Sequence, residues 1–450
     1  MRYLPHTDAD VRAMLERIGV GSIDALFDPI PKSHRLERPL ALEPALDEAA
    51  LMAHLEALAN KNDAARALSF LGAGLYDHHI PPAVDQLLLR SEFYTAYTPD
   101  QPEVSQGTLQ SIFEFQTMVC ELFGMEVANA SMYDAASAVA EAVLMARRLT
   151  NKKHCVLSAA VHPEHLETTR TYLRSIDEGA PALDLAPIAA DGRTDLDALA
   201  SLIREDTGAV VLAYPNFLGS VEDLARAREI TQSRGVLLIT ATTEPYALGV
   251  LRPPGSYGVD IAVGEGQPLA VPPQLGGPGV GLFSCKKEHV RQVPGRLVGE
   301  TVDTSGRRGF VLTLSTREQH IRRERATSNI CTNHGLIALA MTIRTAMLGR
   351  QGLEEISRLC LSRTEYLKAR IARLERFSIG CSAPSFNEIV VRREEGKAAP
   401  LLAALAAKGI LAGVDLGRFY PERDHELLVA VTERHSREDL DRLVDALAST

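Results

Sequence analysis

This chain of 450 residues lacks paired cysteines and long uncharged runs. Its six cysteines stand singly, without the close spacing of zinc sites or redox pairs: Cys120, Cys155, Cys285, Cys331, Cys360 and Cys381. We expect most of them to be buried thiols. No uncharged run reaches the ~18 residues that a membrane span needs, and residues 1–10 lack the apolar core of a signal peptide. We therefore expect a reduced, cytoplasmic protein that does not work at a membrane.

Several catalytic signatures are also absent. The chain has no Gly-x-Ser-x-Gly elbow, no P-loop, and no Gly-x-Gly-x-x-Gly after a predicted strand. One cluster of conceivable metal ligands fits no zinc spacing: Asp77, His78, His79 and Glu92. The sequence therefore predicts no metal site.

The chain has fewer basic than acidic residues. With 48 Lys and Arg against 58 Asp and Glu, the formal net charge is −10. That balance argues against nucleic acid or an anionic membrane as the main partner. Hydrophobic residues at 46% and charged residues at 24% are typical of a globular protein, and the length suffices for two or three domains.

The first part of the chain, residues 1–70, predicts a helical arm. Thr7 and Asp10 form a variant of the capping box before apolar residues at helical spacing. Prolines make residues 28–43 an extended connector, and a second amphipathic helix follows over residues 46–58. Such an arm cannot bury its apolar stripe alone, so we expect it to pack on the main body or on a neighbouring subunit.

Residues 71–332 alternate short apolar runs with helical stretches. This alternation predicts a large α/β domain with a mostly parallel sheet that is covered on both faces. The expected strands are 155–158, 209–213, 236–240, 261–263 and 280–284, and the expected helices are 135–149, 164–173, 196–203 and 221–234.

Residues 333–450 predict a smaller α+β domain. Helices are expected at 354–374 and 400–408, strands at 386–391 and 427–431, and a final helix capped by Ser436.

Residues 93–107 form a polar, aromatic segment without periodicity, with two tyrosines and two prolines. Rigid loops of this kind often hold binding residues. A structural loop that covers the sheet edge explains the same composition, so the residues alone leave both interpretations open.

The helix expected from residue 135 begins at a place where an anion is favoured, because unpaired N–H groups and the helix dipole both attract negative charge. The pattern predicts a capping box between Ser131 and Asp134. The Asp134 carboxylate should satisfy those N–H groups and repel a phosphate. We therefore expect capping at this helix start rather than a cofactor phosphate.

A glycine-rich loop runs from Gly264 to Gly281 and contains no lysine. Its last glycines allow backbone to approach a ligand or another chain closely, and Pro278 fixes the turn between them.

A basic segment, residues 317–333, joins a helix turn to a polar linker. It is either a solvated helix face or a site for an acidic or phosphate-bearing partner.

Together, these segments resemble the glycine decarboxylase (P-protein) family of the glycine cleavage system, and within it the first, or alpha, subunit of the two-subunit form. The resemblance covers almost the whole chain. It rests on several long motifs in order: 93–107, 113–117, 127–134, 214–217, 264–281, 294–299, 307–310 and 322–333.

The resemblance implies an α/β fold of the aspartate-aminotransferase group, PLP-dependent transferase fold type I. In the family's catalytic sister subunit, a lysine about eleven positions before the proline of a similar loop forms the Schiff base with pyridoxal phosphate. Counted back from Pro278, the corresponding residue here is Gln267. Since an amide nitrogen is not a nucleophile, no such bond forms on this chain.

The resemblance also implies an activity and partners. The activity is the decarboxylation of glycine, with transfer of the aminomethyl group to the lipoyl group of H-protein. The partner is a beta subunit that carries pyridoxal phosphate, in an α2β2 heterotetramer. This chain then supplies a wall of the channel to the partner's cofactor. The residues expected there are Tyr94, Tyr97, Thr98, Gln101 and Glu103, with Gly276, Gly277 and Gly279 at the contact.

Two positions depart from the family pattern. Asp100 stands where an aromatic residue is usual, and residues 242–245 replace a stretch that usually carries Asp before Pro. Members of the fold group place an aspartate against the pyridine nitrogen at a strand end, and Glu244 is the only carboxylate in the corresponding stretch.

Two other functions remain open from the sequence. One is a scaffold or regulatory relative that only stabilises the cofactor-bearing partner. The other is an autonomous lysine-dependent enzyme, such as an aminotransferase or decarboxylase.

Overall fold

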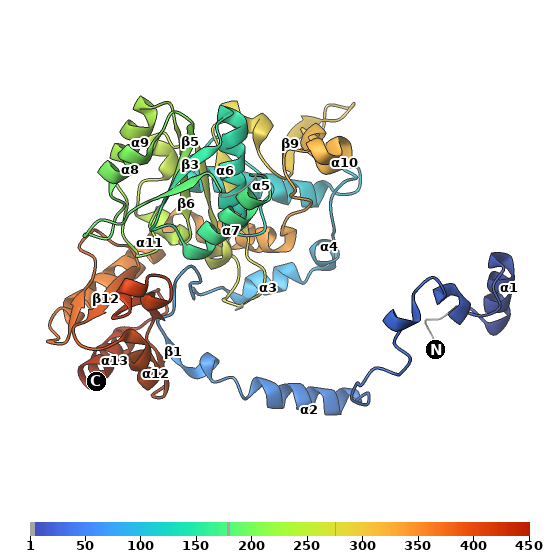
Figure 1. Cartoon of the computed structure of the whole chain (residues 1–450), viewed down its shortest axis with the longest axis horizontal. Coiled ribbons are helices and arrows are strands. Elements are labelled where there is room, and N and C mark those ends of the chain that lie inside the picture. The colour runs from blue at the N-terminus through green and yellow to red at the C-terminus, as the bar shows by residue number, and fades with distance from the viewer. Residues whose placement is uncertain (1–4, 178–180, 275) are drawn as a thin grey trace. The chain divides into compact units, whose positions relative to one another are not determined.

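The computed structural model describes residues 5–177, 181–274 and 276–450. Contacts within the chain divide it into two units, with the boundary between Ala65 and Arg66. Figure 1 colours the chain from blue at the N-terminus to red at the C-terminus. Within the described ranges, no helix combines the length and the apolar character that crossing a membrane requires.

The first unit contains the two predicted helices, α1 (Asp8–Ile18) and α2 (Glu48–Ala59). The capping box of Thr7 and Asp10 is confirmed, and Gly19 ends α1 in the left-handed conformation. Neither helix has a buried residue. What the apolar stripes of these helices pack against remains a prediction.

The second unit is built on a seven-stranded sheet in the order β2-β8-β7-β6-β5-β3-β4. The strands are β2 (Val127–Ala128), β3 (His154–Ser158), β4 (Leu183–Ala186), β5 (Thr207–Ala213), β6 (Leu237–Thr242), β7 (Ile261–Glu265) and β8 (Gly281–Cys285). All neighbours are parallel except β8, which runs antiparallel to both β7 and β2. All five expected strands are confirmed; β2 and β4, short and only partly buried, were not predicted.

Helices cover both faces of this sheet, as predicted. Along β5, Val210 and Leu212 pack into one hydrophobic cluster, while Val211 and Ala213 pack into another, because successive side chains of a strand point to opposite faces. The first cluster includes residues of α3 (Pro82–Leu88), α5 (Gln106–Phe123), α8 (Leu196–Leu202), α9 (Leu224–Ser233) and α11 (Gly335–Ile371); the second includes residues of α6 (Ala135–Thr150) and α7 (Pro163–Arg174).

Helix α11 corrects one prediction. The sequence indicates a helix over 354–374, but the structure has one from Gly335 to Ile371. Gly349, with φ of 59°, interrupts the helical dihedrals inside it, so α11 consists of two helical stretches joined across a kink. The first of these stretches was not predicted.

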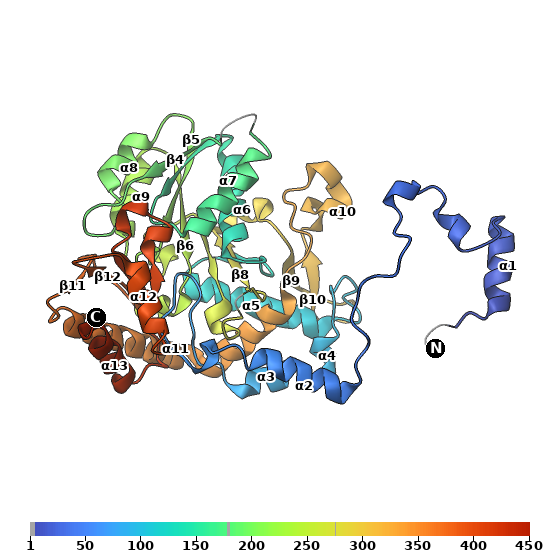
Figure 2. The same cartoon turned by 60° about the horizontal axis from the view of Figure 1, so that its bottom comes forward.

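The C-terminal part forms a four-stranded antiparallel sheet, β11 (Phe377–Ile379), β12 (Glu388–Arg393), β15 (Glu426–Ala430) and β14 (Val414–Asp415). Helices α12 (Ala398–Ala406) and α13 (Arg437–Ala448) share a hydrophobic cluster with it, and Ser436 caps α13 as predicted. Figures 1 and 2 show these elements, in orange to red, gathered at one end of the second unit. The division into residues 1–70, 71–332 and 333–450 remains a prediction.

Short 3-10 helices join many of the elements, and the remaining α-helices and strands are short. They are α4 (Ser91–Tyr94), α10 (Gln319–Arg322), the antiparallel hairpin of β9 (Leu297–Val302) and β10 (Arg308–Thr313), and the parallel pair of β1 (Leu68–Ser69) and β13 (Ile410–Leu411). The hairpin and the 18-residue α5 were not predicted.

Candidate functional site

Gln267 lies just beyond the end of β7 and is buried, with 5% of its surface exposed. Its side-chain Nε2 donates a hydrogen bond to the carbonyl oxygen of Val271 at 2.5 Å. Its amide therefore closes a turn of its own chain. It also lines a cavity of ≈ 540 Å³ together with Gly276, Gly277 and Gly279, so the structure brings the predicted loop glycines and Gln267 to one place.

Glu265 organises this loop. Its Oε1 atom accepts hydrogen bonds from the N–H groups of Gln267 at 3.0 Å and Val280 at 2.8 Å, and its Oε2 atom accepts one from the N–H of Ala135 at 3.0 Å. Burial raises the pKa of Glu265 to about 7, although these three hydrogen bonds oppose the rise. This side chain thus joins both ends of the glycine-rich loop to the start of α6. We did not predict Glu265; a carboxylate between two glycines at the end of an apolar run was the available signal.

Asp134 caps α6, as expected, but with a different partner. Its Oδ1 atom accepts from the N–H of Ser137 at 2.7 Å, and the Ser137 hydroxyl accepts from the N–H of Asp134 at 3.3 Å. The predicted box between Ser131 and Asp134 is wrong. Ser131 has φ of 110° and its hydroxyl has no partner among the described residues, because the chain at Met132 bridges to Gly281 before the helix begins.

The residues of this cavity do not fit a covalently held pyridoxal phosphate. No lysine is found among the described residues that line it. Asp134 and Glu265 occupy two N–H groups at the helix start, which is the place where a phosphate would otherwise be favoured.

Glu244, the only carboxylate in the stretch where the fold group places a pyridine partner, makes its hydrogen bonds to other residues of the chain. Its Oε2 atom lies 2.9 Å from Nε2 of His78 and accepts from Nδ2 of Asn387 at 3.1 Å. Its Oε1 atom accepts from the N–H of Tyr246 at 3.0 Å. Glu244 is absent from the described lining of the Gln267 cavity.

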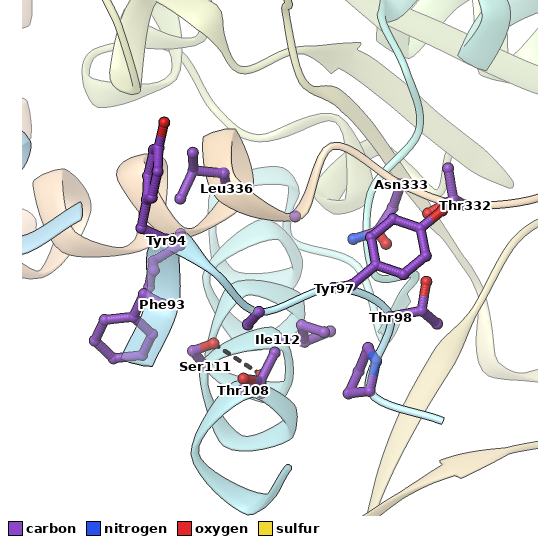
Figure 3. Close-up of a pocket in the computed structure, with 14 residues that line it drawn as sticks. Phe93, Tyr94, Tyr97, Thr98, Thr108, Ser111, Ile112, Thr332, Asn333 and Leu336 are labelled. Carbon is purple, nitrogen blue, oxygen red and sulfur yellow. Dashed lines mark hydrogen bonds between the residues drawn. The ribbon is translucent and has the colours of Figure 1, made fainter. Parts of the chain in front are cut away.

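Three of the five predicted channel residues line a second cavity, of ≈ 200 Å³ (Figure 3). Tyr94 belongs to α4, and Tyr97 and Thr98 follow it along the chain. Tyr97 is 87% exposed. Gln101 and Glu103 are exposed but do not belong to the described lining, which instead includes Thr332, Asn333 and Leu336.

A short segment, residues 331–335, lies between the two cavities. Asn333 and Gly335 line the cavity that contains Tyr94 and Tyr97, which we call the tyrosine cavity. Nδ1 of His334 lies 2.7 Å from the carbonyl oxygen of Gly279, which lines the cavity that contains Gln267, the Gln267 cavity. The ring of His334 packs on Tyr133 at a centroid distance of 5.6 Å. The hydroxyl of Tyr133 accepts a hydrogen bond from the N–H of Cys331 at 3.1 Å. The predicted loop glycines and the predicted tyrosines therefore belong to two separate cavities, which residues 331–335 connect. His334 was not predicted as a site residue.

The metal candidates are not brought together as a set. His78 instead lies beside Cys360 and Glu433, with candidate ligand atoms within 4.8 Å of one another. Glu433 contacts Nδ1 of His78 and Glu244 contacts Nε2, so both ring nitrogens are already in hydrogen bonds with side chains of the protein. Of the six cysteines, four are buried, Cys120 is half-buried and Cys331 is exposed.

Comparison with known proteins identifies the family. A family model described as glycine cleavage system P-protein matches residues 1–447. A probable glycine dehydrogenase (decarboxylating) subunit 1 from Sorangium cellulosum is 60% identical, over 100% of this chain and 99% of its own length. A protein of the same name from Desulforamulus reducens is 46% identical over 100% of both chains.

Solved structures agree with this result. A crystal structure of glycine decarboxylase (P-protein) of the glycine cleavage system, in inhibitor-bound form, is 44% identical, covers 100% of both chains and has a TM-score of 0.90. A sphingosine-1-phosphate lyase from Burkholderia pseudomallei, 13% identical over 92% of both chains with a TM-score of 0.68, shares the fold alone. The predicted fold type I of pyridoxal-phosphate enzymes is confirmed, and this chain belongs to the glycine cleavage system P-protein family.

Proposed function

We propose that this chain is subunit 1 of a two-subunit glycine decarboxylase and that it is active only with a subunit 2 that holds pyridoxal phosphate. The observation that carries this proposal is Gln267, whose amide is buried and hydrogen-bonded to Val271 where the family's chemistry needs an amine. The name of the 60% identical relative, subunit 1, supports the same division of labour.

In the proposed reaction, the bond between the two carbons of glycine breaks and the carboxylate leaves as CO2. The remaining aminomethyl carbon keeps the electron pair and bonds to one sulfur of the lipoyl disulfide of H-protein, while the other sulfur takes up a proton. The disulfide is reduced in this step. Pyridoxal phosphate, when bound to subunit 2, serves as the electron sink for breaking the bond.

The contribution of this chain is a wall beside the partner's cofactor. We place the tyrosine cavity there, because an exposed ring such as Tyr97 is the kind of residue that protein interfaces bury. Gln101 and Glu103 extend the same loop. We propose an α2β2 assembly in the cytoplasm with an obligate interface of more than about 2,000 Å2 in total.

Reconstitution tests the division of labour. The purified chain, subunit 2 and an equimolar mixture are each given lipoylated H-protein, pyridoxal phosphate and carboxyl-labelled glycine, and the released labelled CO2 is measured. We expect release at the full rate from the mixture only. Full-rate release by this chain alone would overturn the proposal.

A second experiment separates a catalytic wall from a scaffold. Tyr97→Ala and Glu103→Gln are combined with subunit 2, with Tyr97→Phe as the matched control that keeps the ring. We expect a lower rate for the first two variants while pairing, measured by size-exclusion chromatography, is intact. An unchanged rate with intact pairing would favour the scaffold.

A further inference from the structure

Five arginines converge on a cavity of ≈ 370 Å³ in the second unit. They come from the end of α6, from the end of α10 and from three 3-10 helices over residues 287–292, 315–317 and 323–325: Arg148, Arg322, Arg291, Arg317 and Arg325. No carboxylate is found among the described residues that line the cavity. In a chain of net charge −10, this is a local concentration of positive charge.

The nearby carboxylates do not balance these charges. Glu324 lies 4.0 Å from Arg325. Glu141 acts on Arg148 through space, but its Oε2 atom has no hydrogen-bond partner in the described structure. Glu318 acts on Arg317 through space, without a close ion pair. For Arg291, Arg317 and Arg322, no carboxylate oxygen of the described residues lies within 4.0 Å of the guanidinium nitrogens. At least three positive charges in this cavity therefore lack a direct counter-ion from the chain.

Two of the arginines, Arg148 and Arg317, are less exposed than the other three. Arg317 is buried, and its guanidinium donates to the carbonyl oxygens of Leu314, Val293 and Gly295, which hold it in place. Burial lowers the pKa of Arg317. A fixed, desolvated cation of this kind gains more from an anion than a solvated one does.

Arg148 still has hydrogen-bond donors to offer. Its Nη2 atom donates to the carbonyl oxygen of Gln292 at 3.1 Å, but its Nε atom is buried and has no partner among the described residues. Burial lowers the pKa of Arg148, and the charge of Arg317 lowers it further. A buried donor without a partner costs free energy, so an anion at this place would stabilise the side chain.

We propose that this cavity binds the phosphate group of a small molecule. Guanidinium forks match the oxygens of phosphate in bidentate geometry, and charge-assisted bonds of this type are strong. A compact anion can reach the half-buried Arg148 and the buried Arg317 as well as the three exposed arginines. An acidic peptide would meet only Arg291, Arg322 and Arg325, which are exposed.

This site is distinct from the ones described above. Its described lining shares no residue with the Gln267 cavity or with the tyrosine cavity. The proposal goes beyond the decarboxylase assignment, and either can fail without the other. It also chooses between the two interpretations of the basic segment 317–333 that the sequence left open.

Calorimetric titration of the full-length chain with inorganic pyrophosphate tests the site. The cavity variant is Arg291→Gln/Arg322→Gln, which changes two exposed side chains and leaves Arg148 and Arg317 intact. The matched control, Arg307→Gln/Arg358→Gln, removes the same charge from arginines of the β9–β10 turn and of α11 that lie outside the cavity. We expect the cavity variant to weaken binding about tenfold or more and the control to leave Kd unchanged.

Three results would overturn the proposal: no heat of binding at millimolar pyrophosphate, equal loss in the two double variants, or equal affinity for citrate at matched ionic strength. A polyglutamate peptide that binds more tightly than pyrophosphate and displaces it would do so too, in favour of an acidic protein segment. A rise in Tm with pyrophosphate that disappears only in the cavity variant would support it by a readout that does not depend on catalysis.

Discussion

The Nδ1 atom of His78 lies 2.6 Å from Oε2 of Glu433, in a partly buried contact between residues 355 positions apart. On the other side of the same ring, Nε2 contacts Glu244, and Tyr246 stacks on its face at a centroid distance of 4.2 Å. Burial alone lowers the pKa of His78, but the two carboxylates outweigh it and raise the pKa to about 9. Burial raises the pKa of Glu433, but His78 and backbone N–H groups lower it to about 2. This ion pair joins the segment before α3 to the chain after β15.

The His78–Glu433 pair predicts a pH-dependent stability. Because the pKa of His78 is raised from 6.5, its contribution is complete below about pH 6.5 and is lost as the pH rises through about 9. Because the pKa of Glu433 is lowered from 4.5, its contribution is lost as the pH falls toward about 2. The Tm difference between the wild type and His78→Gln should therefore shrink between pH 6.5 and 9.5. The exposed His320→Gln serves as control, and a constant difference for His78→Gln across this range would contradict the assignment.

Restoring the missing amine should not restore an autonomous enzyme. In Gln267→Lys, the cavity still contains the carboxylates of Asp134 and Glu265 at the start of α6, which oppose a cofactor phosphate. We expect no stoichiometric borohydride-trapped adduct with pyridoxal phosphate and no release of CO2 from glycine by the variant alone. Gln267→Met serves as the size-matched control. A stoichiometric adduct would show that the lysine was the only missing element.

The close approach of the loop to α6 predicts the effect of a single methyl group. A Cβ atom at Gly281 would lie 2.5 Å from the carbonyl oxygen of Asp134 and 2.6 Å from Cβ of Met132. Gly281→Ala should therefore destabilise the protein by about 1–3 kcal/mol. Gly107→Ala, in helix α5 with open space around the added atom, should be neutral or slightly stabilising. Thermal unfolding of the two variants measures this, and equal Tm values would refute it.

Two helix caps predict losses of similar size. Asp134→Ala removes the bond to the N–H of Ser137, and Ser436→Ala removes the bond to the N–H of Asp439. Each should cost about 1 kcal/mol of stability. The control is Ser131→Ala, because the Ser131 hydroxyl has no partner among the described residues. A loss for Ser131→Ala as large as that for Asp134→Ala would revive the original capping prediction.

The sequence could predict elements whose signal lies within about ten residues. The strands of the main sheet follow from apolar runs, and the capping boxes at Thr7 and Ser436 follow from a spacing of three residues. The first half of helix α11 was not predicted, and neither was the kink at Gly349, which depends on a backbone conformation that composition does not reveal. Hairpin β9–β10 was missed because its strands pair on either side of the polar loop 303–307, and pairing between two separate segments is not a local pattern.

By itself, the sequence determined the family, the fold class and the identity of residue 267, because these depend only on which residues stand in which order. The tertiary structure decided what surrounds that residue. Glu265 reaches the N–H of Ala135 from 130 positions away, and Arg148 meets Arg317 only when α6 packs beside the segment after β10. Such contacts depend on how separate elements pack and in which register, and no local pattern specifies that register.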